Sequence, residues 1–417
     1  MDYITQLGEN AKKAKAAIAN ANTSDKDHIL MTIAANLRQN ADIIIEENKK
    51  DLDNAKANGI SDAMSDRLKL SKERIDAIAD ACNELTALKD PVGEVLGGSV
   101  RPNGMKITKV RVPMGVIGII YESRPNVTVD AAALCIKSGN AVILRGGKEA
   151  INSNKALMEV MRESVKECGF SADIVQLVED ISRESASAMM RANGYIDVLI
   201  PRGGKGLINS VVQNATVPVI ETGSGNCHIY IDESADIDMA VDITDNGKTQ
   251  RPSVCNALET CLVHKDIAKD FLPALKKRFE DGVGVEIRGC EETRRILGED
   301  IKPATDTDYA TEFNDYIIAI KVVNNIDEAI AHIAKYSTFH SECIITKDLD
   351  NAEKFQKEVD SACVYVNCST RFTDGGEFGL GAEIGISTQR LHARGPMGLS
   401  ELTTCKYLIN GNGQIRQ

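Results

Sequence analysis

From residue 115 to residue 226 the chain repeats one pattern: a short aliphatic run, a polar turn rich in glycine, and a longer helical stretch. Strands that alternate with helices in this way are joined by right-handed crossovers and form a parallel sheet. The pattern therefore predicts a doubly wound α/β domain of the nucleotide-binding kind. The four strands and the turns that follow them are GVIGIIY with SRPN, AVIL with RGGKE, DVLIP with RGGKG, and VPVI with ETGSGN.

The regions on either side of this pattern have different periodicities. In the first ninety residues apolar positions recur every three or four residues, which predicts a helical segment. Met105 to Val112 alternates as a strand and predicts a hairpin or edge ribbon, and LTTCKYLINGNG near the C-terminus predicts a second edge strand. Exposed edges are satisfied when they pair between subunits, so we expect a homo-oligomer. A second α/β domain is predicted from His228 onward, with IDEAIAHIAKY as a helix and ECIITKD and ACVYVN as strands.

Composition excludes several classes of protein. The 417 residues are 43% hydrophobic and 26% charged, which is typical of a folded globular chain and not of a disordered one. The 49 basic and 61 acidic residues give a net charge of −12, and aromatic residues make up 4%, so nucleic acid is not an expected partner. No apolar run is long enough for a membrane span, and the N-terminus lacks a signal-peptide pattern, so we expect a cytoplasmic protein with no membrane partner. The eleven scattered cysteines have no zinc or disulfide spacing, and no metal is expected.

Two of the polar turns have the composition of phosphate-binding loops. Arg145-Gly146-Gly147-Lys148 and Arg202–Gly206 each follow a strand and precede a helix, where glycine lets the backbone approach an anion and the basic residues neutralise it. Neither turn matches the Walker pattern, and the turn that begins at Gly223 lacks the third glycine of the ordinary dinucleotide fingerprint. The alternative is that these glycines only shape turns.

Cys255 is the best candidate for a nucleophile. Four other cysteines lie in apolar runs and are predicted to be core residues, namely Cys135, Cys261, Cys343 and Cys363. Cys255 instead follows a polar loop, residues 246–253, and we expect it to open a helix over residues 256–260. A cysteine at a helix N-terminus beside cations has a depressed pKa and reacts as the thiolate.

Several long motifs then resemble one family, the aldehyde dehydrogenase superfamily, along the whole chain. The resemblance implies an aldehyde dehydrogenase-like α/β fold with a Rossmann-type cofactor domain, an α/β catalytic domain and a small β ribbon for oligomerisation. It assigns residues 1–104, 115–230 and 368–396 to NADPH binding, 231–367 to the catalytic domain with the cysteine, and 105–114 and 397–417 to the ribbon. The motifs are YESRPNVT, ILRGGKEA, IPRGGKG, KTQRPSVCN, YVNCSTRFTDGGEFGLGAEIG and LHARGPMGL.

The branch of the superfamily that these motifs resemble implies one reaction. It is the NADPH-dependent reduction of L-glutamyl 5-phosphate to L-glutamate 5-semialdehyde with release of phosphate, the second step of proline biosynthesis from glutamate. Cys255 would attack the acyl carbon and form a thioester, which hydride then reduces. Asn126 would donate its amide N–H to the oxyanion, although it is alternatively a turn residue after Pro125.

The same resemblance assigns the remaining site residues. Arg145 and Lys148 would face the 2′-phosphate of NADPH, and Glu312 would bind the nicotinamide ribose unless it is only a solvated loop carboxylate. Glu221 begins a turn in which oxidising relatives carry a general base, and we expect it to pack or to face the cofactor instead. The cofactor residues are Arg145, Gly146, Gly147, Lys148, Arg202, Gly203, Gly204, Thr222, Gly223 and Glu312, and the substrate residues are Arg124, His340 and Arg371.

Three alternatives compete with this interpretation. Another acyl-phosphate reductase of the superfamily, or an acyl-CoA or aldehyde-oxidising relative, would share Cys255 and the cofactor turns. A kinase of the glutamate type would use the two Gly-Gly-Lys turns for ATP, but the sequence lacks a P-loop and an obvious Asp pair for Mg²⁺. A nucleotide sensor would not need the nucleophile. The expected partners are the small-molecule substrate and, by the resemblance, the glutamate kinase of the preceding step.

Overall fold

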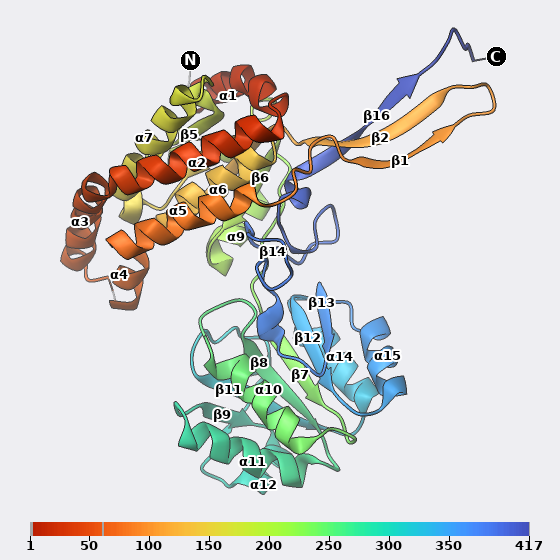
Figure 1. Ribbon diagram of the computed structural model, residues 1–417. Helices are drawn as coiled ribbons and strands as arrows, with labels where there is room; N and C mark the ends of the chain where they lie inside the picture. Colours follow the sequence, from red (N-terminus) through yellow and green to blue (C-terminus); the bar gives the residue numbers. More distant parts are fainter. Residues whose placement is uncertain (1–2, 61, 417) are drawn as a thin grey trace. The chain divides into compact units, whose positions relative to one another are not determined.

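The computed structural model describes residues 3–60 and 62–416, which form two compact units (Figure 1). The first unit consists of Met1–Thr222, Gly379–Gly385 and Met397–Gln417. The second unit consists of Gly223–Phe378 and Ile386–Pro396.

The first unit contains five N-terminal helices, a four-stranded parallel sheet with its crossover helices, and a three-stranded antiparallel sheet. Its helices are α1 (Tyr3–Ala19), α2 (Thr23–Gln39), α3 (Ala41–Ala57), α4 (Asp62–Leu68), α5 (Lys72–Thr86), α6 (Asn126–Lys137), α7 (Ile151–Glu167), α8 (Arg183–Met190) and α9 (Lys205–Asn214). Its strands are β1 (Val95–Val100), β2 (Lys106–Pro113), β3 (Val116–Tyr121), β4 (Ala141–Arg145), β5 (Val175–Leu177), β6 (Val198–Arg202) and β16 (Thr403–Asn410).

The four-stranded sheet has the order β5-β4-β3-β6 and is parallel throughout, as the alternating pattern predicted. Every residue of β3 is buried because helices cover both faces of a parallel sheet. On one face Val116 and Ile143 pack against Ile4 of helix α1. The predicted strand over residues 217–220 was wrong: Val219 makes only an isolated parallel bridge to Leu199.

The predicted N-terminal helical segment is confirmed as α1 to α5. Asn22 begins α2 with a capping box, and the side chain of Ser71 accepts the backbone N–H of Arg74 at the start of α5. The buried Asp51 carboxylate of α3 accepts the N–H of Ser153 at 2.8 Å and thereby caps α7. Across the described residues, no helix combines the length and hydropathy that a bilayer span requires.

The predicted hairpin at Met105 to Val112 is also confirmed. Strands β1 and β2 pair in antiparallel fashion, β16 pairs with the other edge of β2, and the resulting ribbon extends away from the helices of its own unit (Figure 1). Apolar side chains on its outer strands face solvent, including Val100 and Tyr407.

The second unit is built on a seven-stranded parallel sheet of order β10-β9-β11-β8-β7-β12-β13. Its strands are β7 (Cys227–Ile231), β8 (Leu258–His264), β9 (Glu286–Gly289), β10 (Lys302–Pro303), β11 (Ile317–Val323), β12 (Ser341–Ile345) and β13 (Cys363–Val366), followed by the short pair β14 (Ile386–Ser387) and β15 (Gly395–Pro396). Its helices are α10 (Ile237–Thr249), α11 (Ala268–Asp281), α12 (Glu291–Leu297), α13 (Asp306–Tyr309), α14 (Ile326–Tyr336) and α15 (Leu349–Glu358).

Successive residues of the central strands point to opposite faces of this sheet, as the period of a strand requires. Ile229 and Ile231 of β7 lie in the core cluster formed with α10 and α11. Tyr230 lies between them in sequence and joins the other cluster, which α14 and α15 cover. The predicted second α/β domain is therefore a sheet with a separate core on each face.

A buried ion pair joins helix α10 to strand β8. Lys248 Nζ lies 2.6 Å from Glu259 Oε2, and both side chains are 0% exposed. Burial raises the pKa of Glu259 to about 7 and lowers the pKa of Lys248, because each charge has left water. Either charge is tolerated in this position only because the other is present.

We therefore expect Lys248→Met to lower the free energy of unfolding by about 3–5 kcal/mol, because Glu259 is left as an unpaired buried carboxylate. The double variant Lys248→Met/Glu259→Leu removes both charges and should recover most of that loss. Urea unfolding followed by circular dichroism measures both. Lys354→Met, which breaks an exposed pair with Asp327, is the control and should cost less than about 1 kcal/mol. Equal losses in the single and double variants would contradict the explanation.

Candidate active site

Cys255 lies in a turn between helix α10 and strand β8 and does not open a helix. The predicted helix over residues 256–260 was wrong, because Leu258 to Thr260 already belong to β8 and pair with β7 and β11. The preceding residues 246–249 were predicted as loop and instead form the last turn of α10. Pairing within the sheet has overridden local helix propensity, and no helix N-terminus activates the Cys255 thiol.

The cation beside Cys255 comes from a distant part of the chain. The guanidinium of Arg371 is half-buried and donates from Nε to Gln250 Oε1 at 2.8 Å. Burial and the neighbouring Arg251 lower the pKa of Arg371, whereas the nearby Cys255 raises it. A fixed positive charge next to a thiol stabilises the thiolate, so Arg371 can do what the helix was expected to do.

The residue after Cys255 holds Arg371 in place. Asn256 Nδ2 donates to the carbonyl oxygens of Arg371 at 3.1 Å and Thr373 at 2.9 Å, and Thr370 Oγ1 donates to the Asn256 carbonyl at 2.8 Å. These bonds fix the short turn η3 (Thr370–Phe372) against the cysteine loop. Sequence reasoning missed Asn256, although its position directly after the candidate nucleophile was a usable signal.

The glycine turn that begins at Gly223 rests on the backbone of Cys255. A Cβ atom at Gly225 would lie 1.3 Å from the Cys255 carbonyl oxygen, so only glycine fits there. The Gly225 N–H donates to Glu312 Oε1 at 3.0 Å, and Cys227 Sγ donates to the same Cys255 carbonyl at 3.2 Å. Glu312 is half-buried and its carboxylate holds the glycine turn in place. It is therefore not the solvated loop carboxylate that the sequence analysis gave as the alternative.

His340 is placed deep in the second unit. Its side chain is 0% exposed, and Nδ1 lies 2.8 Å from Ser341 Oγ and 3.8 Å from Cys227 Sγ. Burial lowers the pKa of His340 to about 4, so the imidazole is neutral near pH 7. It can act as a hydrogen-bonding group there but supplies no positive charge.

The polar turns of the first unit follow neighbouring strands and therefore meet at one edge of their sheet. Two acidic side chains tie these turns together. Glu149 Oε1 accepts the N–H of Ser123 at 2.9 Å, and Glu122 Oε2 accepts the N–H of Gly204 at 2.8 Å. Sequence reasoning missed both carboxylates because their partners follow other strands.

The predicted cofactor residues of the first unit also lie at this edge. Arg145 is half-buried and donates from Nη2 to the Ser182 carbonyl at 2.8 Å, and burial lowers its pKa. Lys148 is exposed at the first position of the short helix η1 (Lys148–Ala150). Thr222 Oγ1 donates to the Pro201 carbonyl at 2.8 Å. This bond holds Thr222, the last residue of the unit's first segment, beside strand β6.

Asn126 is the first residue of helix α6, and its side chain is hydrogen-bonded to an acidic residue one turn further along. One N–H of its Nδ2 group donates to Asp130 Oδ2 at 2.8 Å. Burial raises the pKa of Asp130 to about 6, although the bond from Asn126 and the charge of Arg202 act in the opposite direction. The bond orients the amide and leaves its second N–H for another acceptor.

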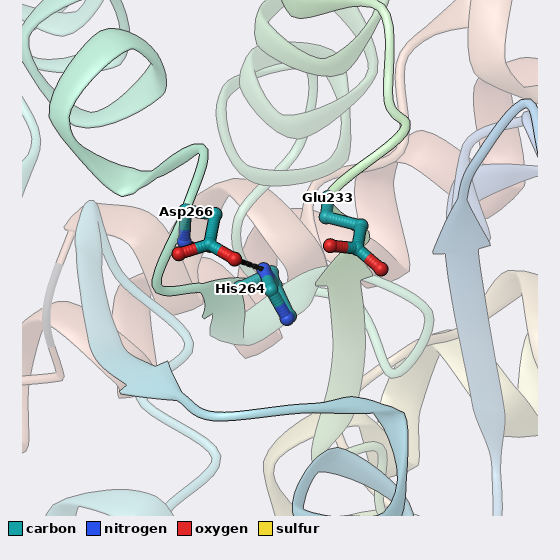
Figure 2. Close-up of side chains that lie close together, drawn as sticks. All are labelled: Glu233, His264 and Asp266. Atoms are coloured by element: carbon teal, nitrogen blue, oxygen red, sulfur yellow. Dashed lines mark hydrogen bonds and ion pairs between the residues drawn. The ribbon is translucent and has the colours of Figure 1, made fainter.

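A separate group of polar side chains lies at the other end of the central strands. Within the described part of the chain, ligand atoms of Glu233, His264 and Asp266 all lie within 4.8 Å of one another (Figure 2). His264 ends strand β8, whereas Cys255 precedes its first residue, so this group is not part of the cysteine site. The Asp266 N–H donates to His264 Nδ1 at 3.3 Å, and Asp266 Oδ2 lies 3.8 Å from the same nitrogen.

With this geometry in hand, the class of protein is clear. Residues 2–286 match the family described as Aldehyde dehydrogenase family, and the chain belongs to that family of oxidoreductases acting on aldehyde-level substrates. It is 60% identical over 409 residues to the gamma-glutamyl phosphate reductase of Clostridium perfringens (strain 13 / Type A), and this match covers 98% of each chain. It is 58% identical over 416 residues to that of Carboxydothermus hydrogenoformans, which covers 100% of each.

A solved structure agrees with these relatives. The crystal structure of gamma-glutamyl phosphate reductase from Thermotoga maritima matches with a TM-score of 0.98 at 51% identity and covers 100% of each chain. The family resemblance and the aldehyde dehydrogenase-like α/β fold predicted from the sequence are both confirmed.

We expect Gly225→Ala to displace the Cys255 loop, because the added methyl group cannot share space with the Cys255 carbonyl. Thermal unfolding should begin at a lower temperature, and the rate at which iodoacetamide alkylates Cys255 should change several-fold. Gly206→Ala is the matched control, since a Cβ there meets no atom within 4 Å. Unchanged Cys255 alkylation in Gly225→Ala would show that the contact does not position the cysteine.

We expect Asp130→Asn to stabilise the protein more at pH 8 than at pH 4. The folded-state pKa of Asp130 is about 6 against an ordinary 3.8. The native state therefore retains a proton that the unfolded chain releases, and this stabilising contribution is lost as pH rises from about 4 to about 6. The variant has no such loss, so its melting temperature relative to wild type should rise over that interval. The exposed Glu159→Gln serves as control, and a pH-independent difference would contradict the assignment.

Proposed function

We propose that the chain catalyses the NADPH-dependent reduction of L-glutamyl 5-phosphate to L-glutamate 5-semialdehyde and phosphate, in proline biosynthesis from glutamate. The observation that carries this proposal is the position of Cys255 in a turn that Asn256 ties to the backbone of Arg371, in a chain of this family. The printed names of the relatives support the choice of substrate. A kinase would need none of these features.

In the proposed reaction the Cys255 thiolate attacks the acyl carbon of the substrate. The bond from that carbon to the phosphate oxygen breaks, inorganic phosphate leaves with the bonding electrons, and a thioester to Sγ remains. NADPH, when bound, supplies the hydride that converts the thioester carbonyl to a tetrahedral oxyanion. The oxyanion collapses, the C–S bond breaks, and Cys255 returns as the thiolate while the aldehyde is released.

We propose that Asn126 stabilises the oxyanion. Its second amide N–H is available because Asp130 takes only the first, and a preorganised amide is effective where negative charge develops. Arg371 and Arg124 are the proposed cationic partners of the anionic substrate. His340 is proposed as a neutral hydrogen-bonding residue near the substrate, in keeping with its burial.

The residues of the first unit suit a nicotinamide dinucleotide phosphate. Members of the family use nicotinamide cofactors. Arg145 Nε is buried without a hydrogen-bond partner among the described residues, which suits an additional anion such as the 2′-phosphate. With Lys148 it is proposed to select NADPH. The other proposed cofactor contacts are Gly146, Gly147, Arg202, Gly203, Gly204, Thr222, Gly223 and Glu312.

A reductase has no use for an activated water, so we give Glu221 no role as a general base. We also propose a homo-oligomer assembled through the exposed apolar ribbon of β1, β2 and β16, whose open edges suit pairing with a second copy. A glutamate kinase, which would form the acyl phosphate, is the proposed partner in the preceding step.

The proposal is tested by running the reaction backward. Glutamate semialdehyde, NADP⁺ and inorganic phosphate are supplied, and NADPH formation is followed at 340 nm. We expect turnover that requires phosphate and is faster with NADP⁺ than with NAD⁺. Turnover without phosphate would mean hydrolysis and restore a base role to Glu221, and no turnover at all would reject the proposed reaction.

Cys255→Ser should lower turnover by at least about a thousandfold, because the serine hydroxyl is not ionised and is a poor nucleophile. Its affinity for NADPH should stay near that of wild type. Cys368→Ser is the matched control in the same unit: burial raises the pKa of Cys368, and its loss should leave activity intact. Mass spectrometry after mixing with semialdehyde and NADP⁺ should find the acyl adduct on wild type only. Turnover by Cys255→Ser would remove the nucleophile assignment.

A further inference from the structure

The carboxylate of Glu122 occupies the N-terminus of helix α9. Gly204 is the N-cap residue of this ten-residue helix and has no side chain of its own to satisfy the first N–H groups. Glu122 Oε2 accepts the Gly204 N–H at 2.8 Å from the end of the neighbouring strand β3. A helix N-terminus carries a partial positive charge of about half a unit, so the carboxylate lies where a negative charge is stabilised.

The contact with the turn is close. A Cβ atom at Gly203 would lie 2.6 Å from Glu122 Oε2 and 2.7 Å from its Cδ, so the carboxylate lies directly over the two glycines. The backbone of Glu122 is fixed, because its N–H donates to the Arg202 carbonyl at 3.1 Å. The side chain itself is exposed and can turn away from the glycines without any change in the backbone.

The other acidic residue at this edge behaves differently. Glu149 is half-buried and accepts both the N–H and the hydroxyl of Ser123, at 2.9 and 2.5 Å. It therefore holds the turn after β3 together, and a Cβ atom at Gly147, the residue before η1, would clash with its Oε1. Glu122 is the one of this pair that accepts the N–H of the N-cap residue of an α-helix.

We propose that Glu122 is an internal substitute for a cofactor phosphate. In the free protein it caps α9, and it has to turn away before a phosphate oxygen of the dinucleotide can accept the Gly204 N–H. Glu122 thereby weakens cofactor binding and speeds cofactor release. The inference rests on the proposed function, because it assumes that the Arg202–Gly204 turn receives the dinucleotide.

The test compares Glu122→Gln and Glu122→Ala with wild type in titrations of NADPH fluorescence. Each variant should bind NADPH roughly two- to fivefold more tightly, the size of a charge effect at a helix N-terminus, and the gain should shrink at high salt. In stopped-flow measurements NADPH should leave the variants more slowly. Glu159→Gln removes a charge from an exposed position of helix α7 in the same unit and is the control, which should not tighten binding.

Thermal unfolding supplies a second measurement, the rise in melting temperature that NADPH causes, which a purely structural role would not increase. Without cofactor, Glu122→Ala should melt below wild type because α9 has lost its cap; saturating NADPH should raise its melting temperature by more than it raises that of wild type. Affinity that is unchanged or weaker in both variants, with wild type binding normally, would overturn the inference alone. Failure of wild type to bind NADPH would overturn the proposed function, and this inference with it.

Discussion

The contact between Gly225 and the carbonyl of Cys255 fixes the candidate active site of the second unit. It brings the start of strand β7 against the loop before β8 and leaves no room for a side chain between them. Glu312 and Cys227 then bind the same two backbone segments, so the cysteine is held by main-chain geometry on one side. On its other side Asn256 fixes the turn that carries Arg371. The thiol and its cation are therefore placed by different parts of the chain.

The parts of the site that local sequence could predict are those that depend on local periodicity. Alternating apolar runs and glycine turns predicted the parallel sheet of the first unit and the α/β character of the second, because the side-chain period of a strand is visible within a few residues. The helix after Cys255 was wrongly predicted, since NALET has fair helical propensity alone, but its last three residues belong to β8, where pairing within the seven-stranded sheet decides. The bonds from Glu312 to Gly225 and from Glu122 to Gly204 join residues 87 and 82 positions apart, and no spacing rule indicates them.

Acidic side chains have a consistent role at the sheet edges of both units. Glu122, Glu149 and Glu312 each accept a backbone N–H of a turn that glycine or serine leaves open. Turns built to approach a ligand closely cannot carry large side chains of their own, so their N–H groups need acceptors from elsewhere when no ligand is bound. This explains why each unit has carboxylates at turns that are proposed to bind anionic ligands.

An internal acceptor that a ligand must displace, as proposed for Glu122, preorganises its turn but opposes the ligand. A turn whose N–H groups already point at a carboxylate needs little rearrangement when a phosphate arrives, which lowers the cost of ordering on binding. The same carboxylate must be displaced, and that displacement subtracts from affinity. For an enzyme that must release its cofactor in every cycle, weaker binding at a rigid turn is compatible with rapid turnover, since only interactions stronger in the transition state accelerate the chemical step. The exposed position of Glu122, in contrast to the half-buried Glu149 and Glu312, fits this division between a displaceable acceptor and two fixed ones.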